Sequence, residues 1–188
     1  LQLHGVEFRT DIANYAKQRL ASQDIPVHVG GTHSRTRLAY ATGSATGRGE
    51  LFVRSLDRYE GTSLAAGPVG DAPYHPFFSP DGQWIGFVTP TELKKVPITG
   101  GTPIKLSKVN RSRGASWGPD GTIVISPERG SGLFTVPAAG GELQPLTTVD
   151  TENSEIAHRW PQVVPGGSVI FTTLLQGSDS ADEAVIES

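Results

Sequence analysis

The stretch that decides the fold is residues 75–87, His-Pro-Phe-Phe-Ser-Pro-Asp-Gly-Gln-Trp-Ile-Gly-Phe. Its centre, Pro80-Asp81-Gly82, recurs 39 residues later as Pro119-Asp120-Gly121, and a degraded copy, Pro165-Gly166-Gly167, follows after a further 46 residues. Proline fixes φ and glycine accepts positive φ, so each copy predicts a tight turn between two strands. Recurrence at this period predicts a repeat architecture.

A second marker repeats with nearly the same offset. Residues 95–101, Lys-Val-Pro-Ile-Thr-Gly-Gly, are echoed 40 residues later by Thr-Val-Pro-Ala-Ala-Gly-Gly at 135–141. Each unit holds four short segments rich in β-branched and aromatic residues, separated by turn residues. We expect strands at 74–79, 83–89, 92–98 and 103–107, and in the next unit at 114–117, 122–126, 132–137 and 142–147.

The flanks extend the pattern in both directions. Residues 36–64 resemble an earlier unit without the turn motif, with strands at 37–41 and 50–57, and strands at 160–164, 168–173 and 184–187 supply an incomplete last unit. Residues 11–22 differ, because their apolar residues fall at helical spacing behind a capping Asp11. The predicted organisation is an N-terminal segment, 1–30, with a short helix, then repeat units at about 31–66, 70–108, 110–149 and 156–188.

Four strands in about 40 residues is the size of a propeller blade. The predicted fold class is therefore all-β, a partial β-propeller of about four four-stranded blades with a short N-terminal helix. A β-sandwich of short hairpins is the alternative, since it gives strands at similar spacing. We further expect the turn residues Asp81 and Asp120 to hold their hairpins, and Trp84, Trp117 and Trp160 to pack between blades.

The blade motif resembles that of TolB-like, WD-repeat-like bacterial β-propellers at residues 75–87 and 113–123. Residues 132–141, followed by His-Arg-Trp-Pro-Gln at 158–162, are similar to the propeller region that lies C-terminal to bacterial Ser/Thr protein kinase domains. The resemblance implies a repeat scaffold for protein interaction or sensing, on the extracytoplasmic side of a bacterial membrane protein. It implies no chemistry within the propeller, because function belongs to sites and not to folds.

Composition excludes several classes of function. A net charge of −3 gives no nucleic-acid footprint, and no apolar run is long enough to insert into a membrane. The chain has no cysteine, so it uses no disulfide or thiolate metal site. It also has no methionine, even at position 1, and this favours a piece of a longer protein.

No catalytic motif stands out, and whether the parent protein is an enzyme stays open. The kinase loops and the Gly-x-Ser-x-Gly elbow of serine hydrolases are missing, and the glycine-rich run at 43–49 fits a hairpin turn. No cofactor or metal is expected: the five histidines lack paired ligand spacing, and Asp179, Asp182 and Glu183 lack the order of a calcium loop.

One constellation predicts a binding site. In a propeller, the loops that lead into the innermost strands meet at one mouth of the channel. Here these loops carry aromatic and cationic residues, namely Tyr74, His75, Arg111, Arg113, His158 and Arg159. Arginine is suited to capturing carboxylates or phosphates, so an anionic peptide or small acid is the predicted ligand. The alternative is that these arginines pair with acidic residues of neighbouring blades or face water.

Three hypotheses on function follow. The first is a non-catalytic interaction or sensor module with a protein or peptide partner, a fragment of a longer bacterial protein such as a Ser/Thr kinase. The second is an accessory propeller domain of a prolyl-oligopeptidase-type hydrolase whose catalytic domain is absent. The third is homodimerisation, because open blade edges and faces invite pairing with a second copy.

Overall fold

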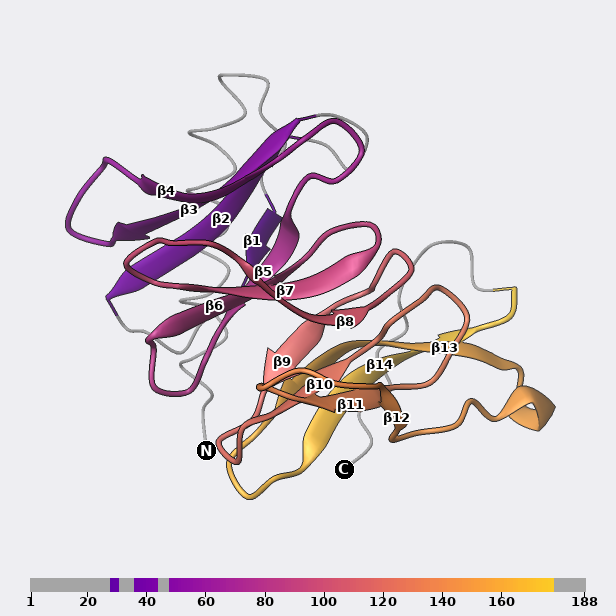
Figure 1. The fold of residues 1–188 in the computed structure, drawn as a ribbon. Coiled ribbons are helices and arrows are strands. Elements are labelled where there is room, and N and C mark those ends of the chain that lie inside the picture. The colour runs from indigo at the N-terminus through magenta and orange to yellow at the C-terminus, as the bar shows by residue number, and fades with distance from the viewer. Residues whose placement is uncertain (1–27, 31–35, 44–47, 178–188) are drawn as a thin grey trace.

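The computed structural model describes residues 28–30, 36–43 and 48–177, with the backbone alone for residues 28–30. These residues form three antiparallel sheets of four strands and one pair of strands (Figure 1). The first sheet contains β1 (His28–Gly30), β2 (Arg37–Gly43), β3 (Gly49–Ser55) and β4 (Thr62–Gly67). The second contains β5 (Tyr74–Phe78), β6 (Trp84–Val88), β7 (Glu92–Pro97) and β8 (Ile104–Lys108).

The third sheet contains β9 (Ala115–Trp117), β10 (Thr122–Ile125), β11 (Phe134–Pro137) and β12 (Gln144–Pro145). A short 3₁₀ helix, η1 (Thr151–Asn153), then leads to the paired strands β13 (Glu155–Val163) and β14 (Val169–Leu175). In all four sheets the strands follow one another in sequence order. The first strands β1, β5, β9 and β13 lie next to one another along the series, as the inner strands of propeller blades do (Figure 1).

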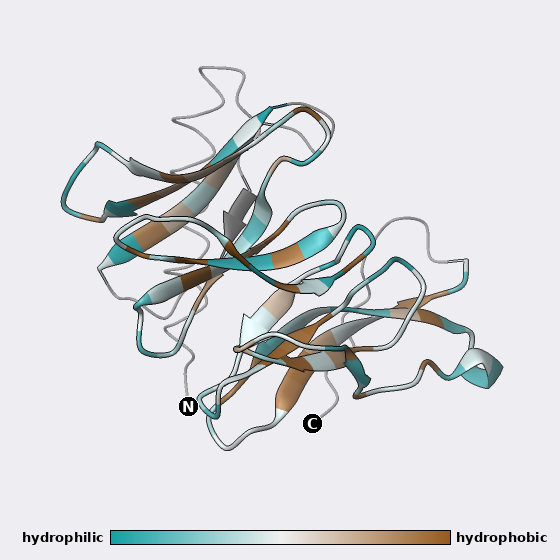
Figure 2. Cartoon of the chain, viewed as in Figure 1, coloured by the Kyte–Doolittle hydropathy of each residue, from teal (hydrophilic) through white to brown (hydrophobic). Residues whose placement is uncertain are grey.

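The core lies between successive sheets. Side chains of a strand alternate between its two faces, so Ile85 and Phe87 pack against the first sheet while Val88 packs against the third. Gly86 faces the third sheet as well, and a Cβ there would overlap the ring of Phe77. Figure 2 shows hydrophobic residues concentrated on the strands and hydrophilic ones in the connecting loops.

Each repeated turn is held by its aspartate. The backbone N–H of Gln83 donates to Asp81 Oδ1 at 3.0 Å, and the Ser79 hydroxyl donates to the same oxygen. In the next blade the N–H of Thr122 donates to Asp120 Oδ1 at 3.0 Å. The expected role of both aspartates is confirmed by these bonds.

The predicted fold class is confirmed, and the strands expected at 74–107 and 114–147 agree with β5–β12 to within two residues. The last blade is less accurate, because β13 begins at Glu155 and not near residue 160. The first strand, β1, falls inside the segment assigned to the N-terminal part, since three residues are too short for a recognisable alternation. The division at residue 30 remains a prediction, and the expected helix at 11–22 and strand at 184–187 lie outside the described residues.

The three tryptophans contact neighbouring blades, as expected. Trp117 is buried between the second and third sheets, and Trp84 is half-buried against the same cluster. The ammonium of Lys95 lies 4.6 Å from the Trp84 ring centroid, a cation–π contact. Trp160 also contacts neighbouring blades, at His75 and Gly114, but it is less buried than the other two, with 43% of its surface exposed. Among the described residues, no helix is long and apolar enough to cross a membrane.

Candidate functional site

The inner strands of three successive blades share one backbone irregularity. His75, Gly114 and Trp160 have φ values of 47°, 109° and 53°, in the left-handed region that residues other than glycine rarely adopt. Each stands seven residues before the last glycine of its blade's turn motif, so the three positions are equivalent. In β5 and β13 the register shifts at this point, between Tyr74 and Phe77 and between Arg159 and Gln162.

A bulge of this kind turns a side chain away from the regular alternation of the strand. The residue just before it is Tyr74 in the second blade, Arg113 in the third and Arg159 in the fourth. These three side chains therefore start from the same position and the same end of their blades. Because left-handed backbone at His75 and Trp160 is strained, its recurrence marks this end as a candidate site.

Aromatic rings connect the three blades at this end. The His75 ring lies edge-on to Tyr74 and to Trp160, with centroid distances of 4.8 Å in both cases. The backbone N–H of Trp160 donates to the carbonyl oxygen of Arg113 at 2.9 Å, and the Trp160 side chain covers Gly114. Trp160 thus contacts the second and third blades from the fourth, while much of its surface stays open to solvent.

The electrostatics show that the arginines of this end lie close together. Burial lowers the pKa of the Arg113 guanidinium, and the nearby positive charges of Arg129 and Arg159 lower it further. Burial also raises the pKa of Tyr74 to about 12, against the opposing effect of Arg113 and Arg111. The guanidinium groups remain charged, because arginine keeps its proton in proteins.

These positive charges have no carboxylate partner within the described residues. The salt bridges found there use Lys94, Lys105 and His158, and none of them uses an arginine. Among the residues that the structure describes, the Nε atoms of Arg113 and Arg159 are buried without a hydrogen-bond partner, and Arg159 Nη2 donates one long bond of 3.4 Å, to the carbonyl oxygen of Arg129. Within the part of the chain that the structure describes, pairing with acidic residues of neighbouring blades does not account for these arginines.

His158 does not belong to this group, and its expected place at the mouth requires correction. It precedes Arg159 and takes the opposite side of β13, where its ring is 3% exposed and packs on Phe171. Its Nδ1 lies 2.7 Å from Thr147 Oγ1, and its Nε2 lies 3.1 Å from Glu155 Oε2. Both ring nitrogens of His158 are thus occupied by hydrogen bonds, and through Thr147 the residue joins the third blade to the fourth.

The Thr147–His158–Glu155 arrangement has the residue types of a catalytic triad but not the geometry of a nucleophile. Thr147 Oγ1 accepts the backbone N–H of Leu133 at 2.8 Å, so the hydroxyl is already used in holding the chain. The imidazole is buried, and an attacking group needs access to substrate. We treat this cluster as structural.

The structure adds Arg129 and Trp160 to the residues expected at this end. Arg129 lies between β10 and β11, a connection that ends at the same side as the loops before the inner strands. The sequence offered a signal for it, because in a four-stranded antiparallel blade the loop after the second strand returns to that side. We call Tyr74, His75, Arg111, Arg113, Arg129, Arg159 and Trp160 the cationic mouth.

Within the described residues, no group of three His, Asp or Glu side chains could hold a metal ion. Asp179, Asp182 and Glu183 lie outside the described residues. The chemistry available at the cationic mouth is therefore recognition of negative charge by guanidinium groups, beside aromatic surface.

Comparison with solved structures identifies the class of fold. The chain is similar to TolB from Acinetobacter baumannii, with a TM-score of 0.63 at 16% identity over 82% of this chain and 39% of that one. A putative TolB from Agrobacterium tumefaciens gives a TM-score of 0.58 at 18% identity over 79% and 54%, respectively. A gluconolactonase from Xanthomonas campestris gives 0.54 at 16% identity over 72% and 52%.

The fold is thus that of a partial β-propeller, similar to TolB and to related propeller proteins, and at these identities the likeness concerns the fold alone. The chain spans between 39% and 54% of the length of these three structures. No protein-family model matches the sequence, and no curated protein matches it either.

Proposed function

We propose that this chain is a non-catalytic binding module of a longer bacterial protein and that its cationic mouth binds an acidic peptide. The observation that carries the proposal is the repeated bulge, which brings Tyr74, Arg113 and Arg159 from three blades to one end. These guanidinium groups lack a carboxylate partner among the described residues, and a carboxylate of an anionic ligand can pair with them.

The aromatic residues of the mouth fit a peptide better than a bare ion. The edge-on contacts of His75 with Tyr74 and Trp160 leave part of the indole exposed next to the arginines. Exposed aromatic surface beside arginine is the composition of interface centres in protein complexes. An inorganic ion would use the charges alone and gain nothing from the rings.

Isothermal titration with a short peptide rich in Asp and Glu tests this proposal. We expect saturable binding that weakens as salt is raised, and that weakens by about tenfold or more in the double variant Arg113→Ala/Arg159→Ala. The matched control is Arg48→Ala/Lys108→Ala, which removes the same charge from exposed positions outside the mouth. Equal binding by both double variants would overturn the proposal.

The parent protein is a separate part of the proposal. The resemblance at 132–141 and 158–162 supports a Ser/Thr protein kinase, with the propeller on the extracytoplasmic side of the membrane. The blade motif at 75–87 also supports the accessory propeller of a prolyl-oligopeptidase-type hydrolase. The coding sequence next to this chain distinguishes them: kinase motifs upstream favour the first, and a nucleophile elbow downstream favours the second.

Self-association through the terminal sheets completes the proposal. Tyr40 and Phe52 stack at 5.3 Å on the face of the first sheet that is turned away from the second. A second copy packed against this face would extend the series of blades towards a closed ring. Light scattering after size-exclusion chromatography tests it: a mass near twice 19.9 kDa supports pairing, and a monomer at high concentration excludes it.

A further inference from the structure

A cavity of about 330 Å³ lies between the first and second sheets, at the opposite end of the blades from the cationic mouth. Its walls come from the start of β2 at Arg37, the end of β3 at Ser55, the start of β4 at Thr62 and the residues after β7. In an antiparallel blade these positions share the end away from the start of the first strand. Its volume falls in the range of about 300–1,000 Å³ that is typical of small-molecule sites.

The cavity combines a hydrophobic floor with a cationic rim. Val53 and Ile98, 7% and 8% exposed, belong to the core between the two sheets and reach the cavity at its edge. Three arginines, Arg37, Arg54 and Arg58, line it together with one carboxylate, that of Glu60. None of these four charged side chains forms a salt bridge within the described residues.

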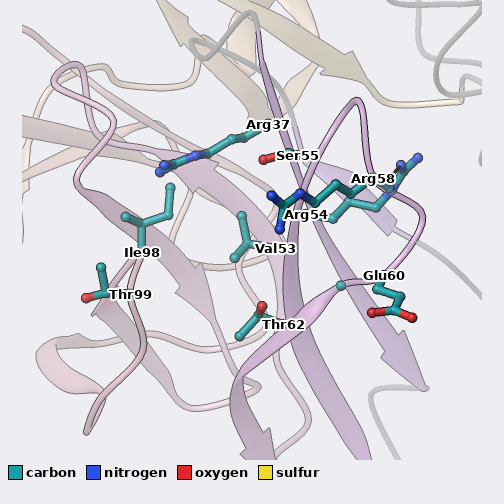
Figure 3. Close-up of a pocket in the computed structure, with 10 residues that line it drawn as sticks. Arg37, Val53, Arg54, Ser55, Arg58, Glu60, Thr62, Ile98 and Thr99 are labelled. Carbon is teal, nitrogen blue, oxygen red and sulfur yellow. Dashed lines mark hydrogen bonds between the residues drawn. The ribbon is translucent and has the colours of Figure 1, made fainter.

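The charged side chains that line the cavity point in different directions. Figure 3 shows Arg37 reaching towards Ile98, while the Glu60 carboxylate is turned away from it. Arg54 Nη1 donates to the carbonyl oxygen of Arg58 at 2.6 Å, which fixes the position of that guanidinium group. A guanidinium carries five N–H donors, and within the described residues the other donors of Arg54 make no further hydrogen bond.

We propose that this cavity is a second binding site, for a small organic acid with a short hydrocarbon chain. The carboxylate binds Arg37, with Arg54 also in the lining, and the hydrocarbon chain lies on Val53 and Ile98. Charge-assisted hydrogen bonds to a guanidinium group favour a planar carboxylate, and burial of the chain adds hydrophobic free energy that an inorganic ion lacks. The site is independent of the cationic mouth, and neither proposal needs the other.

Two-dimensional ¹H–¹⁵N NMR with hexanoate as the probe tests this inference. We expect saturable shifts at the amides of Val53 and Ile98, with affinity about tenfold higher than for acetate or for hexanol, because each comparison compound supplies only one half of the recognition. The double variant Arg37→Gln/Arg54→Gln should bind hexanoate at least about tenfold more weakly. The mouth variant Arg113→Ala/Arg159→Ala should bind it as the wild type does.

Three results would overturn the inference. These are hexanol binding as tightly as hexanoate, unchanged affinity in the Arg37→Gln/Arg54→Gln variant, and shifts confined to the residues of the mouth. If the double variant fails to fold, Arg37→Gln alone serves, because Arg37 is exposed and has no hydrogen bond or ion pair from its side chain within the described residues. Loss of hexanoate binding with retained binding of the acidic peptide supports two separate sites.

Discussion

At the turn end of the second and third blades, Asp81 and Asp120 form hydrogen bonds inside their own hairpins. At the mouth end of the third and fourth blades, Arg113 and Arg159 lie close enough for one to lower the pKa of the other, with no carboxylate partner within the described residues. In the second to fourth blades the repeat thus places hydrogen-bonded carboxylates at the turn end, and at the mouth end it places arginines that have no carboxylate partner within the described residues.

The difference distinguishes charged groups that stabilise the fold from charged groups that are available for binding. A charge satisfied within its own turn stabilises that turn and is unavailable to a ligand. Like charges gathered without a partner reduce stability, and such local conflicts are expected at functional sites. Three pairs of substitutions test this comparison between the two ends of the blades.

The largest effect is expected for two consecutive residues of β13. His158→Ala should lower the free energy of unfolding by about 3 kcal/mol, because it removes a buried ring that packs on Phe171, together with its contacts to Thr147 and Glu155, and opens a cavity. Arg159→Ala should change it by less than about 0.5 kcal/mol, since its side chain makes one long hydrogen bond. Urea unfolding measures both. Similar losses would mean that the mouth arginine is structural.

The next effect concerns two glycines with positive φ, one at each end of the third blade. A Cβ on Gly114 would meet Trp160 Cε3 at 2.9 Å, whereas one on Gly121 would meet nothing within 4 Å. Both alanine variants force a side chain into left-handed backbone, at about 1 kcal/mol. Gly114→Ala should lose about 1 kcal/mol more, because the indole must move. Equal losses in the free energy of unfolding would show that the Trp160 ring moves away from the new methyl group without a measurable cost.

The smallest effect is expected at the turn end. The Ser79 hydroxyl and the Gln83 N–H hold the pKa of Asp81 below its ordinary value. A carboxylate of this kind contributes stability above the unfolded pKa of about 3.9 and loses it as the pH falls through the lower folded pKa. Asp81→Ala should therefore be slightly less stable than the wild type at pH 7, and the gap should close in acid. Asp57→Ala, an exposed aspartate outside the repeated turns, is the control. A gap that stays constant with pH would contradict this role.

The accuracy of the sequence prediction differs between blades for a physical reason. In the second and third blades the Pro-Asp-Gly turns fix where one strand ends and the next begins, so the predicted ranges agree with β5–β12. The fourth blade has Pro165-Gly166-Gly167 in that place, and its inner strand runs from Glu155 through the bulge at Trp160. A strand that is interrupted by a bulge has no continuous period-two alternation, and β13 was predicted to begin five residues too late.

The role of Tyr74, Arg111, Arg113 and Arg159 as a binding site remains a prediction, made from their place before the inner strands. His158 was included with them although it is buried on the other side of β13. The bulge explains the error, because it decides which of two consecutive residues reaches the mouth. Arg129 was missed because only the loops before the inner strands were considered, although the loop after the second strand of a blade returns to the same end.

The sequence by itself determined the repeat, the turn chemistry and the all-β class, because these depend on contacts between residues close together in the chain. The tertiary structure decided which charges meet. Arg113 and Arg159 are 46 residues apart, and Arg37 is 61 residues from Ile98. Whether such residues lie side by side depends on how one blade packs on the next, a property of sheet twist and bulges that no local pattern encodes.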